Sequence, residues 1–161
     1  MAITFFDNID PDKVENYYSR DIAIGDKEIQ IDLNFEQESL TREEVSILNA
    51  ALDSIETLLG QSWKWIMDDY KNGSDVAEYI TIHLEDFFAE DPEELLKGTD
   101  PALDNTKRFF QILEINRIGV YPSSPDSYIV LDYMVDEELS NYILVVVVND
   151  KLKLEYITIE S

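Results

Sequence analysis

The sequence contains no cysteine, one histidine and few glycines, and each shortage excludes a class of chemistry. Without cysteine there can be no disulfide, thiolate metal site or cysteine nucleophile, which fits a reducing compartment. One histidine excludes a multi-histidine metal site or proton relay. Only five glycines occur, and the P-loop, GxGxxG, GxSxG and HExxH patterns are all absent. A phosphate cradle of backbone N–H groups is therefore not expected.

Basic residues are also scarce. The chain has 12 Lys and Arg against 35 Asp and Glu, which gives a formal net charge of -23. This charge repels nucleic-acid phosphates and anionic lipid surfaces, and it accelerates encounter with a basic protein. Acidity can also serve solubility alone. We expect a basic protein partner, no nucleic acid, no membrane, no metal and no cofactor.

Long apolar runs and a targeting signal are missing as well. The longest purely apolar runs cover residues 142–148 and 128–131, far short of the ~20 residues that span a bilayer. The N-terminus, MAITFFDNIDPDK, has no basic n-region and no small-residue cleavage site. With 161 residues, of which 45% are hydrophobic, we predict a single cytoplasmic domain over residues 1–161.

The N-terminal part of the chain predicts a β-hairpin followed by helices. Alternate residues from Ile29 to Phe35 are apolar, the pattern of a strand with one buried face. Gly25 and Asp26 supply a tight turn, so the partner strand should end at Ile24. A capping box at Thr41–Glu44 then begins a helix predicted over residues 42 to about 59. Its apolar stripe consists of Val45, Leu48, Leu52, Ile55 and Leu59.

The central helices continue toward residue 97. The apolar face extends to Gly73, with a break or kink predicted at Gly60. Ser74 is the expected cap of a further helix. The residues predicted on its buried side are Val76, Ile80, Leu84 and Phe87. Asp91-Pro92 either ends this helix or begins a short helical turn through Lys97.

From Lys107 onward the pattern becomes β. Four segments with short links, beginning with KRFFQILEINRIGVYP and ending with KLKLEYITI, predict an antiparallel meander. Residues 145–148 are four valines, which predicts a central strand covered on both sides. The predicted fold is α+β, with an N-terminal β-hairpin, central helices and a C-terminal antiparallel β-meander packed on the helices.

The densest acidic region lies at residues 85–104, where eight acids accompany Lys97 alone. We predict a binding surface that combines this region with the loop before the valine strand. Its predicted members are Glu85, Asp86, Glu90, Asp91, Glu93, Glu94, Asp136, Glu137 and Glu138. Trp63, Trp65 and Tyr70 are candidate anchors if they are exposed, and core residues otherwise.

A candidate pocket consists of His83, Arg117 and Asp132. His83 could act as a general base, or it could be a helix-flank residue bonded to backbone or solvent. Asp132 interrupts an apolar strand, where Arg117 on the preceding strand could pair with it across the sheet. An enzyme would require these groups, or His83 and Glu85, to share one pocket.

Residues 117–161 contain four short motifs, which are Arg117-Ile118-Gly119-Val120-Tyr121-Pro122, Asp132-Tyr133, Leu144-Val145-Val146 and Glu160-Ser161. With these motifs the C-terminal part resembles a bacterial family of cytoplasmic domains of unknown function. Related acidic α+β domains serve as immunity proteins beside secreted toxins, so the resemblance implies a binding role.

Three functions follow from these observations. The first is a non-enzymatic acidic protein-binding domain, including an immunity-type protein that occludes a basic toxin or nuclease. The alternatives are a hydrolase or metal-dependent enzyme that uses His83 and nearby carboxylates, and a structural or regulatory module that self-associates through a sheet edge.

Overall fold

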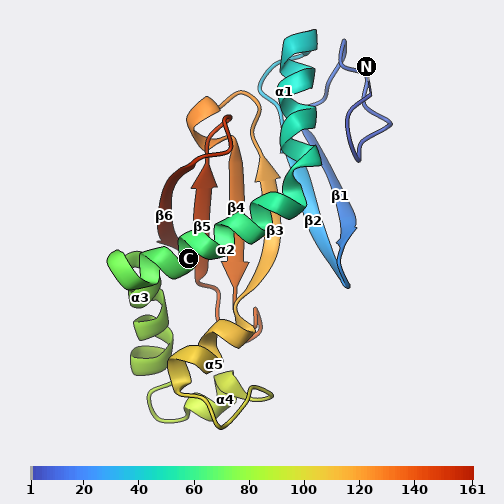
Figure 1. The fold of residues 1–161 in the computed structure, drawn as a ribbon. Helices are drawn as coiled ribbons and strands as arrows, with labels where there is room; N and C mark the ends of the chain where they lie inside the picture. Colours follow the sequence, from blue (N-terminus) through green and yellow to red (C-terminus); the bar gives the residue numbers. More distant parts are fainter. Residues whose placement is uncertain (1) are drawn as a thin grey trace.

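The computed structural model describes residues 2–161 and has the predicted α+β architecture (Figure 1). The strands are β1 (Tyr17–Ile24), β2 (Lys27–Asn34), β3 (Glu114–Val120), β4 (Ile129–Met134), β5 (Ile143–Val148) and β6 (Leu154–Glu160). The helices are α1 (Arg42–Asp53), α2 (Ile55–Asn72), α3 (Asp75–Thr81), the π-helical turn η1 (Ile82–Phe87), α4 (Pro92–Leu96), α5 (Asn105–Ile112) and the 3-10 turn η2 (Pro125–Ser127).

All six strands form one sheet in the order β1-β2-β3-β4-β5-β6. The predicted hairpin is confirmed: β1 and β2 pair antiparallel around Gly25, whose φ is +64°. The predicted meander is confirmed for β3 to β6, which also pair antiparallel. β2 pairs parallel with β3, and this pairing joins the hairpin to the meander.

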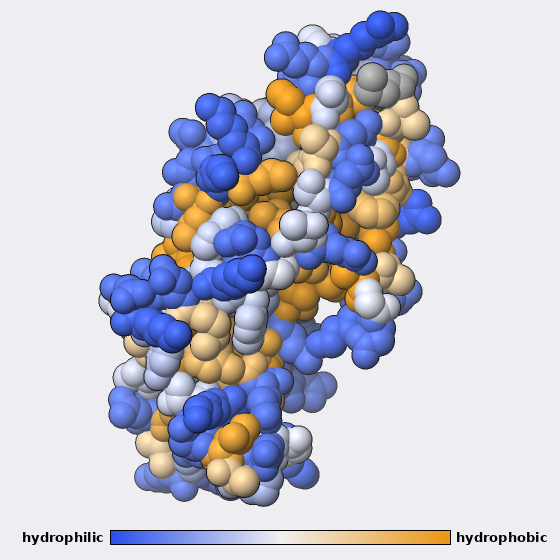
Figure 2. Space-filling model, in the orientation of Figure 1, coloured by the Kyte–Doolittle hydropathy of each residue, from blue (hydrophilic) through white to orange (hydrophobic). Residues whose placement is uncertain are grey.

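One face of the sheet carries the hydrophobic core and is crossed by α2, whereas α4 and α5 lie beyond the lower end of the strands (Figure 1). A single row across this face is made of Ile31, Ile118, Leu131, Val146 and Ile157, all of them buried. Helix α2 crosses the strands on this side, and its Ser62 hydroxyl bonds the Tyr133 hydroxyl of β4 at 2.5 Å. Figure 2 views this side, where hydrophilic residues cover both ends of the molecule.

The opposite face of the sheet, here called the helix-free face, carries the alternate residues of each strand. Its central row runs from Gln30 through Arg117, Asp132 and Val145 to Thr158. Val145 is buried although it does not belong to the helix-side core. The burial of the four-valine strand is therefore confirmed. On the helix-free face, however, neighbouring side chains of the sheet cover Val145, and no helix within residues 2–161 does.

The first helix ends earlier than predicted. The break falls at Ser54, whereas Gly60 lies inside α2 with open space around its Cα. The Ser54 hydroxyl donates to the Ala50 carbonyl at 2.7 Å, and the Ser54 N–H donates to the Ala51 carbonyl. Serine competes in this way for helix carbonyls, which ends α1 well before the glycine.

Residues 107–112 are helical rather than the beginning of a strand, so this prediction was wrong. The Asp104 carboxylate accepts a hydrogen bond from the Lys107 N–H at 2.9 Å and caps α5. Strand β3 then begins at Glu114. The apolar pair Phe109-Phe110 is compatible with a helix or a strand, and the Asp104 cap stabilises the helix.

Candidate functional site

An acidic groove lies at the end of the molecule formed by η1 and α4. This groove has a volume of about 370 Å³. Its lining residues are Asp86, Phe87, Phe88, Ala89, Glu90, Asp91 and Glu94. Four of these residues are carboxylates, and Phe87 beside them is 50% exposed and is one of few large apolar residues at the surface. An exposed aromatic ring among carboxylates is a surface for a partner with an apolar and a basic side chain.

The exposure of Phe87 contradicts its predicted place on the buried side of the helix. The reason is the π-helical turn, in which the Phe88 N–H bonds the His83 carbonyl five residues back at 2.8 Å. Residues five apart, His83 and Phe88, consequently face the core, and Phe87 turns outward. A regular helical spacing cannot reveal this shift.

His83 is fully buried and joins η1 to the loop between β4 and β5. Its Nδ1 lies 2.8 Å from the Tyr79 carbonyl, which can only accept, so Nδ1 carries the hydrogen. Its Nε2 lies 2.7 Å from the Ser140 hydroxyl and accepts that hydrogen, while the Ser140 oxygen accepts from the Tyr142 N–H. Burial lowers the pKa of His83, and the bond to the Tyr79 carbonyl offsets this only in part.

The two acidic segments therefore come to the same end of the molecule. The Phe87 ring packs edge-on against Tyr142 with centroids 5.2 Å apart, and the Tyr79 hydroxyl donates to the Tyr142 carbonyl at 2.7 Å. The loop carboxylates nevertheless open into a different hollow of about 270 Å³, which Asp136 and Glu137 line. The predicted surface is thus divided between two separate hollows that share no lining residue.

Two of the predicted surface carboxylates have internal partners. Glu93 receives two hydrogen bonds from Arg108, at 2.6 and 2.8 Å, and this ion pair lowers the pKa of Glu93. The Asp136 carboxylate accepts from the Glu138 N–H at 2.9 Å and stabilises the loop. Glu85, Asp86, Glu90, Asp91, Glu94, Glu137 and Glu138 remain at the surface.

The predicted pair of Arg117 and Asp132 exists, but Arg117 binds a second carboxylate more closely. Arg117 and Asp132 are directly opposite in register, with 3.3 Å from Nη1 to Oδ2. The Nε and Nη2 atoms of Arg117 donate to Asp32 at 2.6 and 2.7 Å. Asp32 is 0% exposed although the alternation places it on the predicted solvent face. Its burial is the feature that the sequence pattern did not reveal.

Gly119 makes room for this guanidinium. A Cβ at Gly119 would lie 2.7 Å from Nη2 of Arg117 and 3.0 Å from the ring of Tyr121. The Tyr121 hydroxyl accepts from the same Nη2 at 2.8 Å. Burial alone would lower the pKa of Arg117, but its bonds to Asp32 and Tyr121 raise it above the ordinary value. One ion cluster therefore explains Arg117, Gly119 and Tyr121, whereas Ile118 and Val120 between them belong to the hydrophobic core.

His83 and Asp132 lie on opposite sides of the sheet, so the predicted pocket that would combine them is not formed. His83 belongs to the helix side, among Tyr79, Phe109 and other aromatic residues. Asp132 belongs to the helix-free face with Arg117. Within residues 2–161, no group of three or more His, Cys, Asp or Glu side chains is placed to hold a metal ion.

The three candidate anchors on α2 are all partly buried and pack against the core. Trp63 packs against Phe110 and Tyr133, and Tyr70 packs against Phe110. Trp65 also lines a surface groove beside β6, so part of its side chain is accessible to a partner at that groove.

Comparisons of the chain with protein-family models, with curated proteins and with solved structures found no match. None of the helices formed by residues 2–161 has the length and apolar character needed to cross a membrane.

Asp132→Asn is expected to increase the free energy of unfolding at pH 7 by on the order of 1 kcal/mol, the usual size of a single-substitution effect. Burial raises the pKa of Asp132, Arg117 opposes this, and Glu160 and Asp32 add to it. Ionised Asp132 therefore destabilises the fold at neutral pH, and this penalty disappears as the pH falls below its folded pKa. Urea denaturation of both proteins, at pH 7 and at a pH below the folded pKa of Asp132, measures the difference in the free energy of unfolding. A loss of stability at pH 7 would contradict the prediction.

Proposed function

We propose that this protein is a non-enzymatic acidic domain that binds a basic protein partner. The observation that carries the proposal is the groove at Phe87, where Asp86, Glu90, Asp91 and Glu94 line the same hollow as a half-exposed aromatic ring. None of these carboxylates has a salt-bridge partner among residues 2–161. Unpaired charge at a surface is free to neutralise the charge of a partner.

The rigidity of this end supports a role in binding. Phe87 stands on η1, which His83 and Tyr79 tie to the loop between β4 and β5. An aromatic side chain held in place loses little conformational entropy when a partner covers it. The groove is thus a preformed surface that combines an exposed aromatic side chain with carboxylates.

An immunity-type role is the form of binding that we favour. The net charge of -23 imitates the charge of a polyanionic substrate, so such a domain could occlude the basic cleft of a toxin or nuclease. The resemblance of residues 117–161 to bacterial cytoplasmic domains supports the same proposal. A cytoplasmic location would fit this role.

Pull-down with the tagged protein tests the proposal, with washes at low salt and at ~0.5 M salt, where screening is strong. We expect a basic protein that is retained at low salt and weakened at high salt. Glu90→Gln, Asp91→Asn and Glu94→Gln combined should weaken the purified complex by about tenfold or more, because three exposed charges are lost at the contact. Phe87→Ala should have a similar effect.

A matched control removes the same number of charges at the other end of the molecule. Asp12→Asn, Glu15→Gln and Glu38→Gln combined alter exposed side chains away from the groove. If this variant weakens the complex as much as the groove variant, the net charge alone explains binding. If no basic protein binds at either salt concentration, the proposed function is wrong.

A further inference from the structure

A second acidic groove follows the free edge of the sheet. Strand β6 is last in the strand order, so one of its edges has no neighbouring strand among residues 2–161. The groove has a volume of about 350 Å³. Its lining residues are Trp65, Asp68, Asp69, Asn72, Gly73, Asp75, Leu154, Tyr156 and Ile157. Leu154 is 36% exposed and Tyr156 is 52% exposed, so the edge also presents apolar surface.

We propose that an extended basic segment of the protein partner pairs with β6 as a seventh strand and occupies this groove. The proposal rests on the proposed function for the basic character of the partner, and it adds a second contact surface and a binding mode. An unpaired edge offers backbone N–H and C=O groups in a row, which an extended peptide can satisfy.

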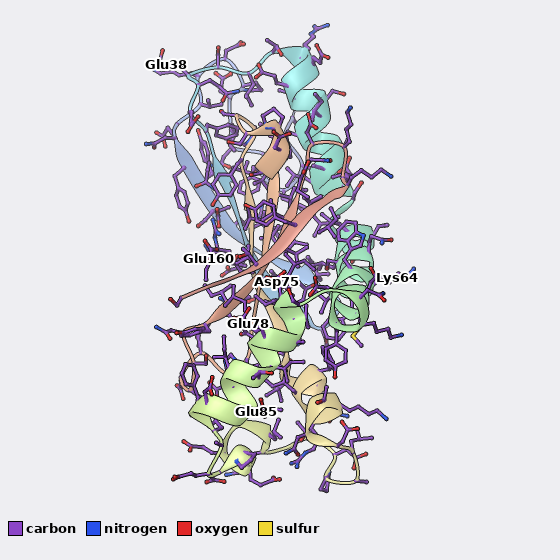
Figure 3. The ribbon with its side chains drawn as sticks, turned by 90° about the vertical axis from the view of Figure 1, so that its left-hand side faces the viewer. Glu38, Lys64, Asp75, Glu78, Glu85 and Glu160 are labelled. Carbon is purple, nitrogen blue, oxygen red and sulfur yellow. The ribbon has the colours of Figure 1, made fainter. Side chains whose placement is uncertain are left out.

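The charges around this edge determine the kind of segment that fits. Asp68, Asp69 and Asp75 line the groove, and no lysine or arginine does. In Figure 3, Glu160 of β6, Asp75 and Glu78 of α3 and Glu85 of η1 follow one side of the molecule. An added segment would therefore be surrounded by carboxylates, which favour lysine and arginine side chains.

The alternation of a strand defines the two sets of contacts. Side chains of an added strand would lie alternately beside Ile157, on the helix side with Asp68 and Asp75, and beside Tyr156 and Glu160, on the helix-free face. A segment that alternates basic and apolar residues can therefore place its basic side chains beside Asp68 and Asp75 and its apolar side chains beside Tyr156. A second copy of this chain fits poorly, because each copy carries a net charge of -23.

Irregular pairing limits the docking site to part of β6. The register of β5 and β6 shifts between Val147 and Val148, whose partners are Tyr156 and Leu154. This bulge twists the first residues of the edge away from regular pairing. From Tyr156 to Glu160 the register is continuous, so the added strand should bond to this stretch and reach the groove at Tyr156 and Ile157.

The test titrates the isotope-labelled protein with acetyl-Lys-Val-Lys-Val-Lys-Val-amide and follows the backbone amides by NMR and hydrogen exchange. We expect binding to slow the exchange of amides in β6, because a new strand protects the edge. A peptide of the same sequence with an N-methyl group on every residue should bind about tenfold more weakly or not at all, since neither of its edges can donate hydrogen bonds to the ladder. Exchange of Lys for Glu in the peptide should also abolish binding.

Protein variants separate this site from the acidic groove at Phe87. Asp68→Asn with Asp75→Asn should weaken the peptide by about tenfold. Glu38→Gln, a change at the far end of the molecule (Figure 3), should have little effect. If the peptide binds at Phe87 and leaves β6 unprotected, the added strand is wrong and the proposed function stands. If the peptide does not bind at all, the added strand is wrong, and the pull-down tests the proposed function separately.

Discussion

Replacing Arg117 with methionine is expected to destabilise the protein by about 3 kcal/mol, because removal of one partner leaves a buried charge without compensation. The carboxylate of Asp32 is fully buried and receives two short hydrogen bonds from Arg117. The guanidinium side chain itself is 28% exposed, which is why we expect the lower end of the range for buried pairs. Urea denaturation at neutral pH measures the loss.

A double variant distinguishes a lost ion pair from lost packing. In Asp32→Asn with Arg117→Met, the fully buried carboxylate is removed together with its partner, so the double variant should be more stable than the sum of the single effects by about 1–3 kcal/mol. Asp132 loses Arg117 in the single Arg117 variant and in the double variant alike, so its contribution cancels in the comparison. Arg42→Met is the matched control, because Arg42 is exposed on α1, and its effect should stay within ~0.5 kcal/mol. Additive single effects would show that the cluster is not coupled.

The sequence predicted most of the strands and helices because local patterns decide them. The alternation from Ile29 to Phe35 and the Thr41–Glu44 capping box are short-range signals, and both are confirmed. The features that were missed depend on long-range contacts or on unusual backbone. Asp32 is buried because Arg117, 85 residues away, covers it. The parallel pairing of β2 and β3 likewise joins distant segments.

In the candidate sites, too, the features that depend on local sequence were predicted, and those that depend on tertiary structure or unusual backbone were not. The acidic region at residues 85–104 was evident from composition, and Asp86, Glu90, Asp91 and Glu94 of this region line a groove. The exposed anchor Phe87 was not predicted, because the π-helical turn shifts the helical period. The edge groove was not predicted either, since strand order cannot be derived from local periodicity.

Acidification is expected to destabilise the native protein through His83, and His83→Gln should remove this effect. Burial lowers the folded-state pKa of His83 below the unfolded value of about 6.5. Between these two pKa values the unfolded state binds one more proton than the folded state. Stability from neutral His83 is therefore present above about pH 6.5 and is lost as the pH falls, at about 1.4 kcal/mol per pH unit.

The structure explains why the folded state resists this proton. The hydrogen already on Nδ1 is donated to the Tyr79 carbonyl, so a second proton must go to Nε2, which accepts from Ser140. Protonation would place two donors face to face until the Ser140 hydroxyl rotated. The neighbouring Tyr79 cannot supply a compensating negative charge, because burial raises its pKa and keeps it neutral.

The measurement compares unfolding of the native protein and His83→Gln by urea from about pH 7 to pH 5, the window in which the histidine titrates. Other groups also change stability over this range: protonation of surface carboxylates relieves repulsion, and Asp132 acts with the opposite sign to His83. These contributions are common to both proteins, so only their difference reports on His83. At pH 7 we expect the His83→Gln variant to be the less stable by about 1–3 kcal/mol, because Ser140 and Tyr79 lose their partner. That gap should narrow steadily as the pH falls, and a constant gap would show that His83 binds its proton equally well in both states.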